Sequence, residues 1–220
     1  MKSNTIKLLA ALIGASFASV SSADVLVNNL NEFGSFTASQ AGGGTGPGTI
    51  YASQFVTGAG LSEVLSATAR LSNGSGWGVA TYEAFIYTDD GDGPGSVVAS
   101  FDSMPTIADG GGIQNVSFTS TLGIVLDPNT AYWFGVRNTT GAYIGWRATA
   151  SDAEASTAGW SIQDNTWYNS YNAGSSWHDY SAFYGNKVPM YSLNGTSVPA
   201  PGSVALLAAG VAIVSRRRRG

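Results

Sequence analysis

The sequence contains no cysteine and only one histidine, His178, in 220 residues. Without cysteine the chain forms no disulfide, so a folded domain has to be stabilised by burial of side chains. One histidine and no cysteine also supply too few ligands for a transition-metal site. His178 precedes Asp179, but adjacent residues of a strand point to opposite faces, and no Gly-x-Ser-x-Gly turn presents a nucleophilic serine. We therefore expect no catalytic residues and no enzymatic activity.

Positive charge is scarce between the two ends of the chain. Of the ten lysines and arginines, two lie in the first seven residues and four form the run Arg216 to Arg219. Only four lysines and arginines remain between the two terminal segments. All fourteen aspartates and glutamates lie there too, between Asp24 and Asp179, so this part of the chain has a net charge of −10. Such an acidic surface repels nucleic acid and favours solubility, so we expect no nucleic-acid partner.

The first 23 residues have the pattern of a secretory signal peptide. Lys2 and Lys7 make the start weakly positive, residues 8–20 are apolar and small, and Ser21-Ser22-Ala23 ends the segment. Small residues at this place predict a cut between Ala23 and Asp24. The sequence thus predicts an N-terminal signal-peptide helix over 1–23, cleaved by signal peptidase, and a mature chain that begins at Asp24.

No apolar run in the sequence is as long as the roughly 20 residues of a full membrane span. The run near the C-terminus, residues 204–214, has eleven uncharged residues and is followed by four arginines. Its ends can be extended by arginine stems that snorkel, and arginines stay on the cytoplasmic side. We expect a short C-terminal transmembrane helix whose anchoring residues are Val204, Leu206, Leu207, Val211, Ile213 and Val214, with Arg216, Arg217, Arg218 and Arg219 as the basic stop.

A proline motif precedes this apolar run: Val198, Pro199, Ala200 and Pro201. Proline motif, apolar run and arginine cluster, in this order, resemble a PEP-CTERM sorting signal, here in residues 196–220. The usual motif is Val-Pro-Glu-Pro, and Ala200 stands in the place of the glutamate. The resemblance implies that an exosortase-type enzyme processes the tail. It also implies an inner-membrane intermediate and a final place at the cell surface or in the extracellular matrix of a Gram-negative-type bacterium.

The residues between the two terminal segments have an all-β composition, with much glycine and many short alternating segments. We expect no helix there. The sequence predicts one domain over 24–195, a single antiparallel β-sandwich, jelly-roll-like, with about ten strands. The expected strands are 25–30, 35–39, 50–57, 61–71, 77–87, 97–101, 116–118, 122–126, 131–138, 143–147 and 188–193.

Three motifs of this domain occur in the order found in a known group of exported domains. They are Phe85-Ile-Tyr followed by Asp89-Asp-Gly-Asp-Gly-Pro-Gly-Ser96, then Val97-Val-Ala-Ser, then Leu126-Asp-Pro-Asn-Thr-Ala-Tyr-Trp-Phe134. The domain resembles the choice-of-anchor domains of bacterial exported proteins, most of all the type called R. The resemblance implies a surface β-sandwich joined to an exchangeable C-terminal anchor, and it supplies no catalytic residues.

Asp89, Asp90 and Asp92 place three carboxylates in one glycine-rich segment. Calcium prefers several oxygen ligands at close range, so these residues are a weak candidate for a Ca²⁺ site. The EF-hand pattern is absent, because Ser100 stands where the glutamate at position twelve is expected. A tight turn built from Asp and Gly is the favoured interpretation, and we expect no metal and no other cofactor.

Aromatic residues are concentrated in residues 160–184, among amides, serines and acidic groups. Aromatic faces suit the C–H faces of sugar rings and also suit protein partners. The favoured interpretation, however, is that Trp160, Trp167 and Trp177 close one end of the sandwich. The candidate ligand-binding residues are Trp160, Trp167, Tyr168, Tyr171, Trp177 and Tyr180.

Three hypotheses for function follow from these patterns. The first is an exported, non-catalytic protein of the cell surface or the exopolysaccharide matrix. The second is a carbohydrate-binding module that uses the aromatic residues of 160–184 to bind an extracellular polysaccharide. The third, and least favoured, is a secreted glycan hydrolase, for which the sequence singles out no pair of carboxylates.

Overall fold

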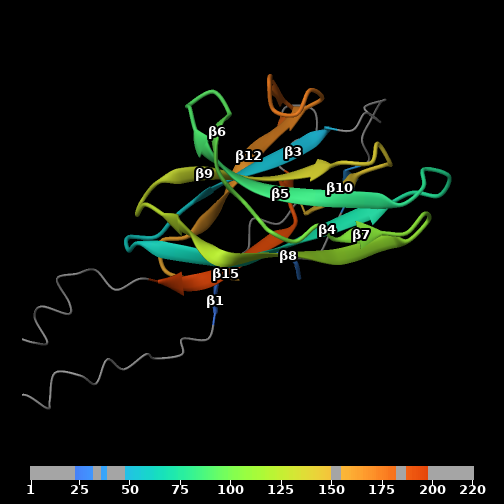
Figure 1. Ribbon diagram of the computed structural model, residues 1–220. Coiled ribbons are helices and arrows are strands. Elements are labelled where there is room, and N and C mark those ends of the chain that lie inside the picture. The colour runs from blue at the N-terminus through green and yellow to red at the C-terminus, as the bar shows by residue number, and fades with distance from the viewer. Residues whose placement is uncertain (1–22, 32–35, 39–47, 150–154, 182–186, 198–220) are drawn as a thin grey trace, which may run out of the picture.

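The computed structural model describes residues 23–31, 36–38, 48–149, 155–181 and 187–197 (Figure 1). The expected signal-peptide helix and the expected C-terminal transmembrane helix lie outside these residues. So do the sorting motif and the arginine run.

The described part of the chain is all-β and forms two antiparallel sheets. The first sheet has the order β11 (Ala155–Ser156), β1 (Asp24–Asn28), β15 (Tyr191–Ser197), β4 (Ser62–Asn73), β10 (Gly145–Thr149), β14 (Val188–Pro189), with β8 (Gly112–Leu126) also paired to β4 and β2 (Phe36–Ala38) to β10. The second has the order β13 (His178–Asp179), β12 (Ser161–Ser170), β3 (Ile50–Val56), β9 (Ala131–Asn138), β5 (Ala80–Asp89), β6 (Pro94–Ser100), with β7 (Thr106–Ile107) paired to β5.

Each expected strand overlaps a strand of the structure, although most bounds differ and the strand expected over 188–193 is divided into β14 and β15. Three larger differences have a physical reason or concern a whole strand. The strand expected over 77–87 begins only at Ala80, because Gly76 and Gly78 have positive φ angles of 84° and 78° that end regular pairing. The strands expected at 116–118 and 122–126 are one strand, β8, in which Gly123 with φ 68° accommodates a bulge opposite β4. The long strand β12 was not expected at all.

The two sheets share one core in which large aromatic side chains meet. The Phe134 ring of β9 lies 5.6 Å from the Trp146 ring and 5.1 Å from the Tyr191 ring, both on the first sheet. The indole N–H of Trp146 donates a hydrogen bond to the carbonyl oxygen of Met190, 2.9 Å away, so the buried ring leaves no unpaired donor. Since no disulfide is present, this shared apolar layer holds the sheets together.

The second sheet is apolar on its outer face as well. Strands β3, β5 and β9 place Ala52, Tyr87 and Trp133 there, in a small buried cluster separate from the main core. In β5, apolar residues occupy both alternating sets, with Ala84 and Ile86 facing the main core and Tyr87 facing the outer cluster. The segments that cover this outer face are the β5–β6 turn and the chain after β12, which are also the two segments in which the sequence placed candidate sites.

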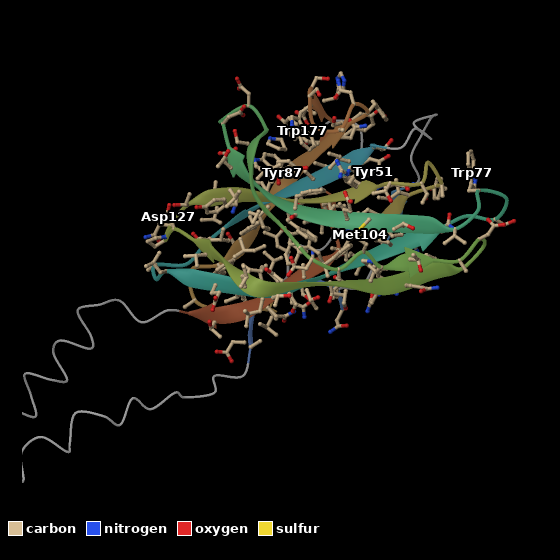
Figure 2. All side chains as sticks on the ribbon, viewed as in Figure 1. Tyr51, Trp77, Tyr87, Met104, Asp127 and Trp177 are labelled. Carbon is tan, nitrogen blue, oxygen red and sulfur yellow. The ribbon has the colours of Figure 1, made fainter. Side chains whose placement is uncertain are left out.

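The two ends of the folded region lie side by side in the first sheet. Asp24 at the start of β1 pairs with Gly195 near the end of β15, and Ser62 at the start of β4 pairs with Ser197. The other end of β4, twelve residues long, leads into the loop that contains Trp77. At about 3.3 Å per residue this places the Trp77 loop about 36 Å along β4 from the chain ends. Figure 2 shows Trp77 at one extreme of the molecule and Asp127, in the turn after β8, at the other.

Candidate functional site

Two of the six candidate binding residues are core residues. Trp160 is 4 % exposed and stacks on Phe55 with ring centroids 5.8 Å apart and ring planes 5° apart. Trp167 is 1 % exposed and meets the edge of Tyr51 at 6.3 Å. The expectation that these two rings belong to a binding surface is therefore wrong. They lie on the inner face of the second sheet because β12 pairs with β3, which sets Trp167 opposite the buried Ser53.

The other four candidates lie on the outer face of the second sheet or beside it. Tyr168 and Trp177 are partly buried against the outer cluster, and Tyr171 is 38 % exposed. The hydroxyl groups of Tyr171 and Tyr180 form a hydrogen bond of 2.9 Å across the β12–β13 hairpin. The structure thus brings these four residues into one region, but only Tyr171 presents a large exposed area.

The hairpin after β12 is shaped by hydrogen bonds between its own side chains and backbone. The hydroxyl oxygen of Ser170 accepts from the backbone N–H of Gly174 at 2.8 Å, and the side-chain oxygen of Asn172 accepts from the backbone N–H of Ser176 at 2.9 Å. Ala173 and Gly174 have positive φ angles of 59° and 89°. These contacts fold the hairpin back over the sheet, so that Trp177 reaches the outer cluster.

In the outer cluster the rings meet edge to face rather than in one plane. Trp133 and Tyr168 lie 5.0 Å apart at 70°, and Tyr87 and Trp177 lie 5.4 Å apart at 82°. Figure 2 labels Tyr87 and Trp177, which lie close together. Gly135 leaves room for the Tyr87 ring, since a Cβ atom there would lie 2.7 Å from it. The rings therefore pack mainly on one another and form no continuous flat strip.

Trp133 belongs to this cluster but was missed by sequence reasoning. It lies between Tyr132 and Phe134 on β9, and all three rings are at most 6 % exposed, so the strand is apolar on both faces. A run of three aromatic residues in one strand was the signal, since alternate residues of a strand cannot all face one core.

The acidic segment joins the same region. One carboxylate oxygen of Asp89 accepts a hydrogen bond from the indole N–H of Trp133 at 2.9 Å, and the Asp90 carboxylate accepts from the backbone N–H of Asp92 at 3.3 Å. Gly93 lies on the Tyr168 ring, where a Cβ atom would come within 2.9 Å. These contacts are those of a tight turn docked on the aromatic cluster. Among the described residues no three His, Cys, Asp or Glu side chains lie together as a metal site requires.

The surroundings of Tyr168 raise the pKa of its phenol. Burial is the largest cause, and the negative charges of Asp179, Asp92, Asp89 and Asp90 add to it. The acidic turn and the aromatic stretch, which are far apart in the sequence, therefore act on the same side chain. The neutral phenol keeps its ability to donate a hydrogen bond throughout the neutral pH range.

Two shallow hollows flank an ion pair on the outer face of the second sheet. Arg137 of β9 and Glu83 of β5 form this ion pair, and the guanidinium carbon lies 4.9 Å from the centre of the Phe85 ring. The hollow toward the β12–β13 hairpin has a volume of about 340 Å³, and the hollow toward Met104 about 280 Å³. This combination of an ion pair and a ring offers hydrogen bonds and one apolar surface to a polar ligand.

His178 and Asp179 are not arranged as a catalytic pair. His178 is exposed on β13, and its ring lies 6.2 Å from the ring of Tyr171. The carboxylate of Asp179 instead accepts a hydrogen bond from the backbone N–H of Ser181 at 2.7 Å. The hydroxyl of Ser181 accepts from the backbone N–H of Trp167, so this pair of residues closes the turn after β13.

The chain matches no protein-family model and no curated protein. In the ranges of the chain that the structure describes, no helix has the length and apolar character of a membrane span. The residues of the sorting motif, the anchor and the basic stop lie outside these ranges.

Proposed function

We propose that this chain is an exported, non-catalytic protein of the bacterial surface or exopolysaccharide matrix, sorted through its C-terminal segment. The observation that supports it best is the position of the strands relative to the terminal segments. The first strand begins at Asp24, directly after the proposed signal-peptidase cut, and the last strand ends at Ser197, directly before Val198. Removal of the leader and processing of the tail would therefore leave every described strand intact.

The proposed identity of the domain is a single β-sandwich of jelly-roll type, similar to the choice-of-anchor domains of type R. Two of the motifs that carry this resemblance have clear structural roles. The segment from Asp89 to Ser96 forms the β5–β6 turn and the start of β6, and the segment from Leu126 to Phe134 forms the turn before β9 and its first half. Each segment forms a turn and the beginning of the strand that follows it in the second sheet, β6 in the first case and β9 in the second.

Processing in a bacterium that has an exosortase-type enzyme tests this proposal. We expect mass spectrometry to find Asp24 as the N-terminal residue and a shortened C-terminus in the extracellular fraction. The double change Pro199→Ala and Pro201→Ala should leave the tail attached and hold the protein at the inner membrane. Pro128→Ala, in a turn of the folded region, is the matched control and should be processed normally. Recovery of the intact chain from the cytosol would overturn the proposal.

A second candidate function is carbohydrate binding by the β12–β13 hairpin. It is favoured by the exposed ring of Tyr171, whose hydroxyl is hydrogen-bonded to that of Tyr180, and by the hollow of about 340 Å³ that Ala173 of the same hairpin lines. Four residues of the original set remain in this candidate, Tyr168, Tyr171, Trp177 and Tyr180. Retardation of the protein in native gels that contain the producer's exopolysaccharide should be lost in Tyr171→Ala. Val125→Ala, which removes an exposed apolar group from β8, should behave like the unchanged protein.

A further inference from the structure

The loop between β4 and β5, residues 74–79, presents a tryptophan at the opposite end of β4 from the pair Ser62–Ser197. We call it the Trp77 loop. Trp77 is 48 % exposed and Val79 is 54 % exposed. The exposed half of the Trp77 side chain contributes nothing to the stability of the fold, because that apolar surface stays in water. The question is therefore what holds the ring outside.

Two side chains from outside the loop fix its backbone. One carboxylate oxygen of Asp109 accepts hydrogen bonds from the backbone N–H groups of Trp77 and Gly78, at 3.0 and 3.1 Å. The side-chain amide of Asn73, which is 1 % exposed, donates to the carbonyl oxygens of Gly78 and Ala108 at 2.7 and 3.0 Å. Because these contacts tie the loop to the segment before β8, the exposure of Trp77 is a property of a fixed loop.

The ring rests on two neighbours that orient it. Gly74 lies under it, where a Cβ atom would be 3.3 Å from the indole carbon Cδ1. Tyr143, from the segment before β10, lies beside it with ring centroids 6.3 Å apart and ring planes 36° apart. Trp77 and Tyr143 therefore form a small two-ring platform, with the carboxylate of Asp109 at its base.

Size and charge decide which partner suits this platform. A stable protein interface needs about 800 Å² from each partner, whereas a whole tryptophan supplies about 150–250 Å², so two rings and a valine are too small an area for a second copy of the chain. An anionic lipid or polyanion is opposed by the charge of −10 over residues 24–195. An uncharged sugar ring matches both the size and the chemistry, since its C–H face packs on an indole.

We propose that the Trp77–Tyr143 platform binds a neutral polysaccharide chain. This proposal rests on the proposed function in one respect, the orientation of the protein. A protein anchored through its C-terminal segment would be held near Ser197, so the Trp77 loop would point away from the membrane into the matrix. The binding chemistry itself needs no export. It also differs from the second candidate function, because the Trp77 loop and the β12–β13 hairpin are separate parts of the surface.

Affinity electrophoresis of the full chain, purified in mild detergent, tests the inference. The gels contain one of three probes: hydroxyethyl cellulose or dextran as neutral polymers, or alginate as a polyanion. We expect retardation by at least one neutral polymer and none by alginate. Trp77→Ala should weaken that binding at least tenfold, and Trp77→Phe should keep part of it.

Leu122→Ala is the matched control, since Leu122 is 89 % exposed on β8 and its removal should leave binding unchanged. Tyr171→Ala should also bind normally. Full binding by Trp77→Ala, loss of binding in Tyr171→Ala alone, or no retardation of the unchanged protein by either neutral polymer would overturn the inference.

Two more outcomes would assign the loop to other partners and so overturn it. One is concentration-dependent dimerisation in sedimentation velocity that Trp77→Ala abolishes. The other is co-sedimentation with phosphatidylglycerol vesicles that depends on Trp77. Failure of export with intact polysaccharide binding would contradict only the proposed function, so the two proposals can fail independently.

Discussion

Trp77 and Trp167 are both surrounded in sequence by small and polar residues, yet one is 48 % exposed and the other 1 % exposed. We expected Trp77 at the start of a strand and counted Trp167 among the candidate binding residues, but the structure places Trp77 in a loop and Trp167 in the core. Trp167 lies in β12 opposite Ser53, where the first sheet covers it. Trp77 lies past the end of β4, beyond the shared core.

The difference teaches that strand pairing, more than local composition, decides the exposure of a tryptophan. Trp167 points into the core, whereas its neighbours on β12, Thr166 and Tyr168, point to the opposite face of the sheet, as alternate residues of a strand do. Glycines on both sides of Trp77 prevent regular pairing instead. An aromatic residue among serines and asparagines is thus equally compatible with a core position and with a surface position.

The largest effect expected from this comparison is that of Trp167→Ala. Removal of a fully buried indole should lower the free energy of unfolding by about 3–5 kcal/mol, because it leaves a cavity between the sheets. Trp77→Ala should change it by about 0.5 kcal/mol or less. Urea denaturation followed by circular dichroism measures both. Equal losses in the two variants would contradict the assignment of Trp167 to the core and Trp77 to the surface.

High pH should destabilise the protein through its buried tyrosines, whose phenols resist ionisation in the folded state. Burial raises the pKa of Tyr82 and of Tyr87 well above the ordinary value of 10.0. The folded protein then keeps two protons that the unfolded chain releases, so stability is complete below pH 10 and falls as the pH rises further. In that range each of the two phenols lowers the free energy of unfolding by up to about 1.4 kcal/mol for every pH unit.

Ultraviolet difference titration with parallel circular dichroism checks this prediction. The two phenols should ionise together with unfolding, in one cooperative step. Tyr87→Phe should shift that step to higher pH, because one of the two groups no longer titrates. Ionisation of both phenols near pH 10 in the folded protein would show that they are open to solvent and would contradict the described burial.

Asn73→Ala should destabilise the protein by about 1–3 kcal/mol, because it leaves buried carbonyl oxygens without their donor. The effect should be concentrated in the Trp77 loop and at Ala108. Hydrogen exchange with mass spectrometry should show faster exchange in residues 74–80 and 107–110, while Trp167 and its strand stay protected. Asn115→Ala, an exposed position on β8, is the control and should leave exchange unchanged.

Asp109→Ala should lower the free energy of unfolding by only about 0.5–1 kcal/mol, since the hydrogen bonds that it removes are exposed to water. Even so, it should loosen the Trp77 loop and lower the affinity for the neutral polymer, because the ring loses its fixed orientation. Thermal unfolding and affinity electrophoresis measure the two effects. An unchanged affinity would show that the carboxylate does not orient Trp77 for binding.

Much of the fold could be predicted, because its signals are local. The alternation of apolar residues in the segment that became β4 and the Asp-Gly turn before β6 placed a strand and a turn correctly. The strand β12 was missed because aromatic residues among amides and serines also fit a loop. The candidate site was only half predictable, since the sequence marked Tyr168 and Asp89 but nothing local says that the acidic turn docks on that ring.

By itself, the sequence determined the all-β character of the described residues, the lack of disulfides, the acidic charge between the two terminal segments and the turns that Asp and Gly impose, because these follow from composition and short-range sterics. Only the tertiary structure decided which tryptophans are buried, that Trp133 joins the outer cluster and that Asp109 holds Trp77 in solvent. Each of these depends on a partner far away in the chain, and the pairing of distant strands brings those partners together.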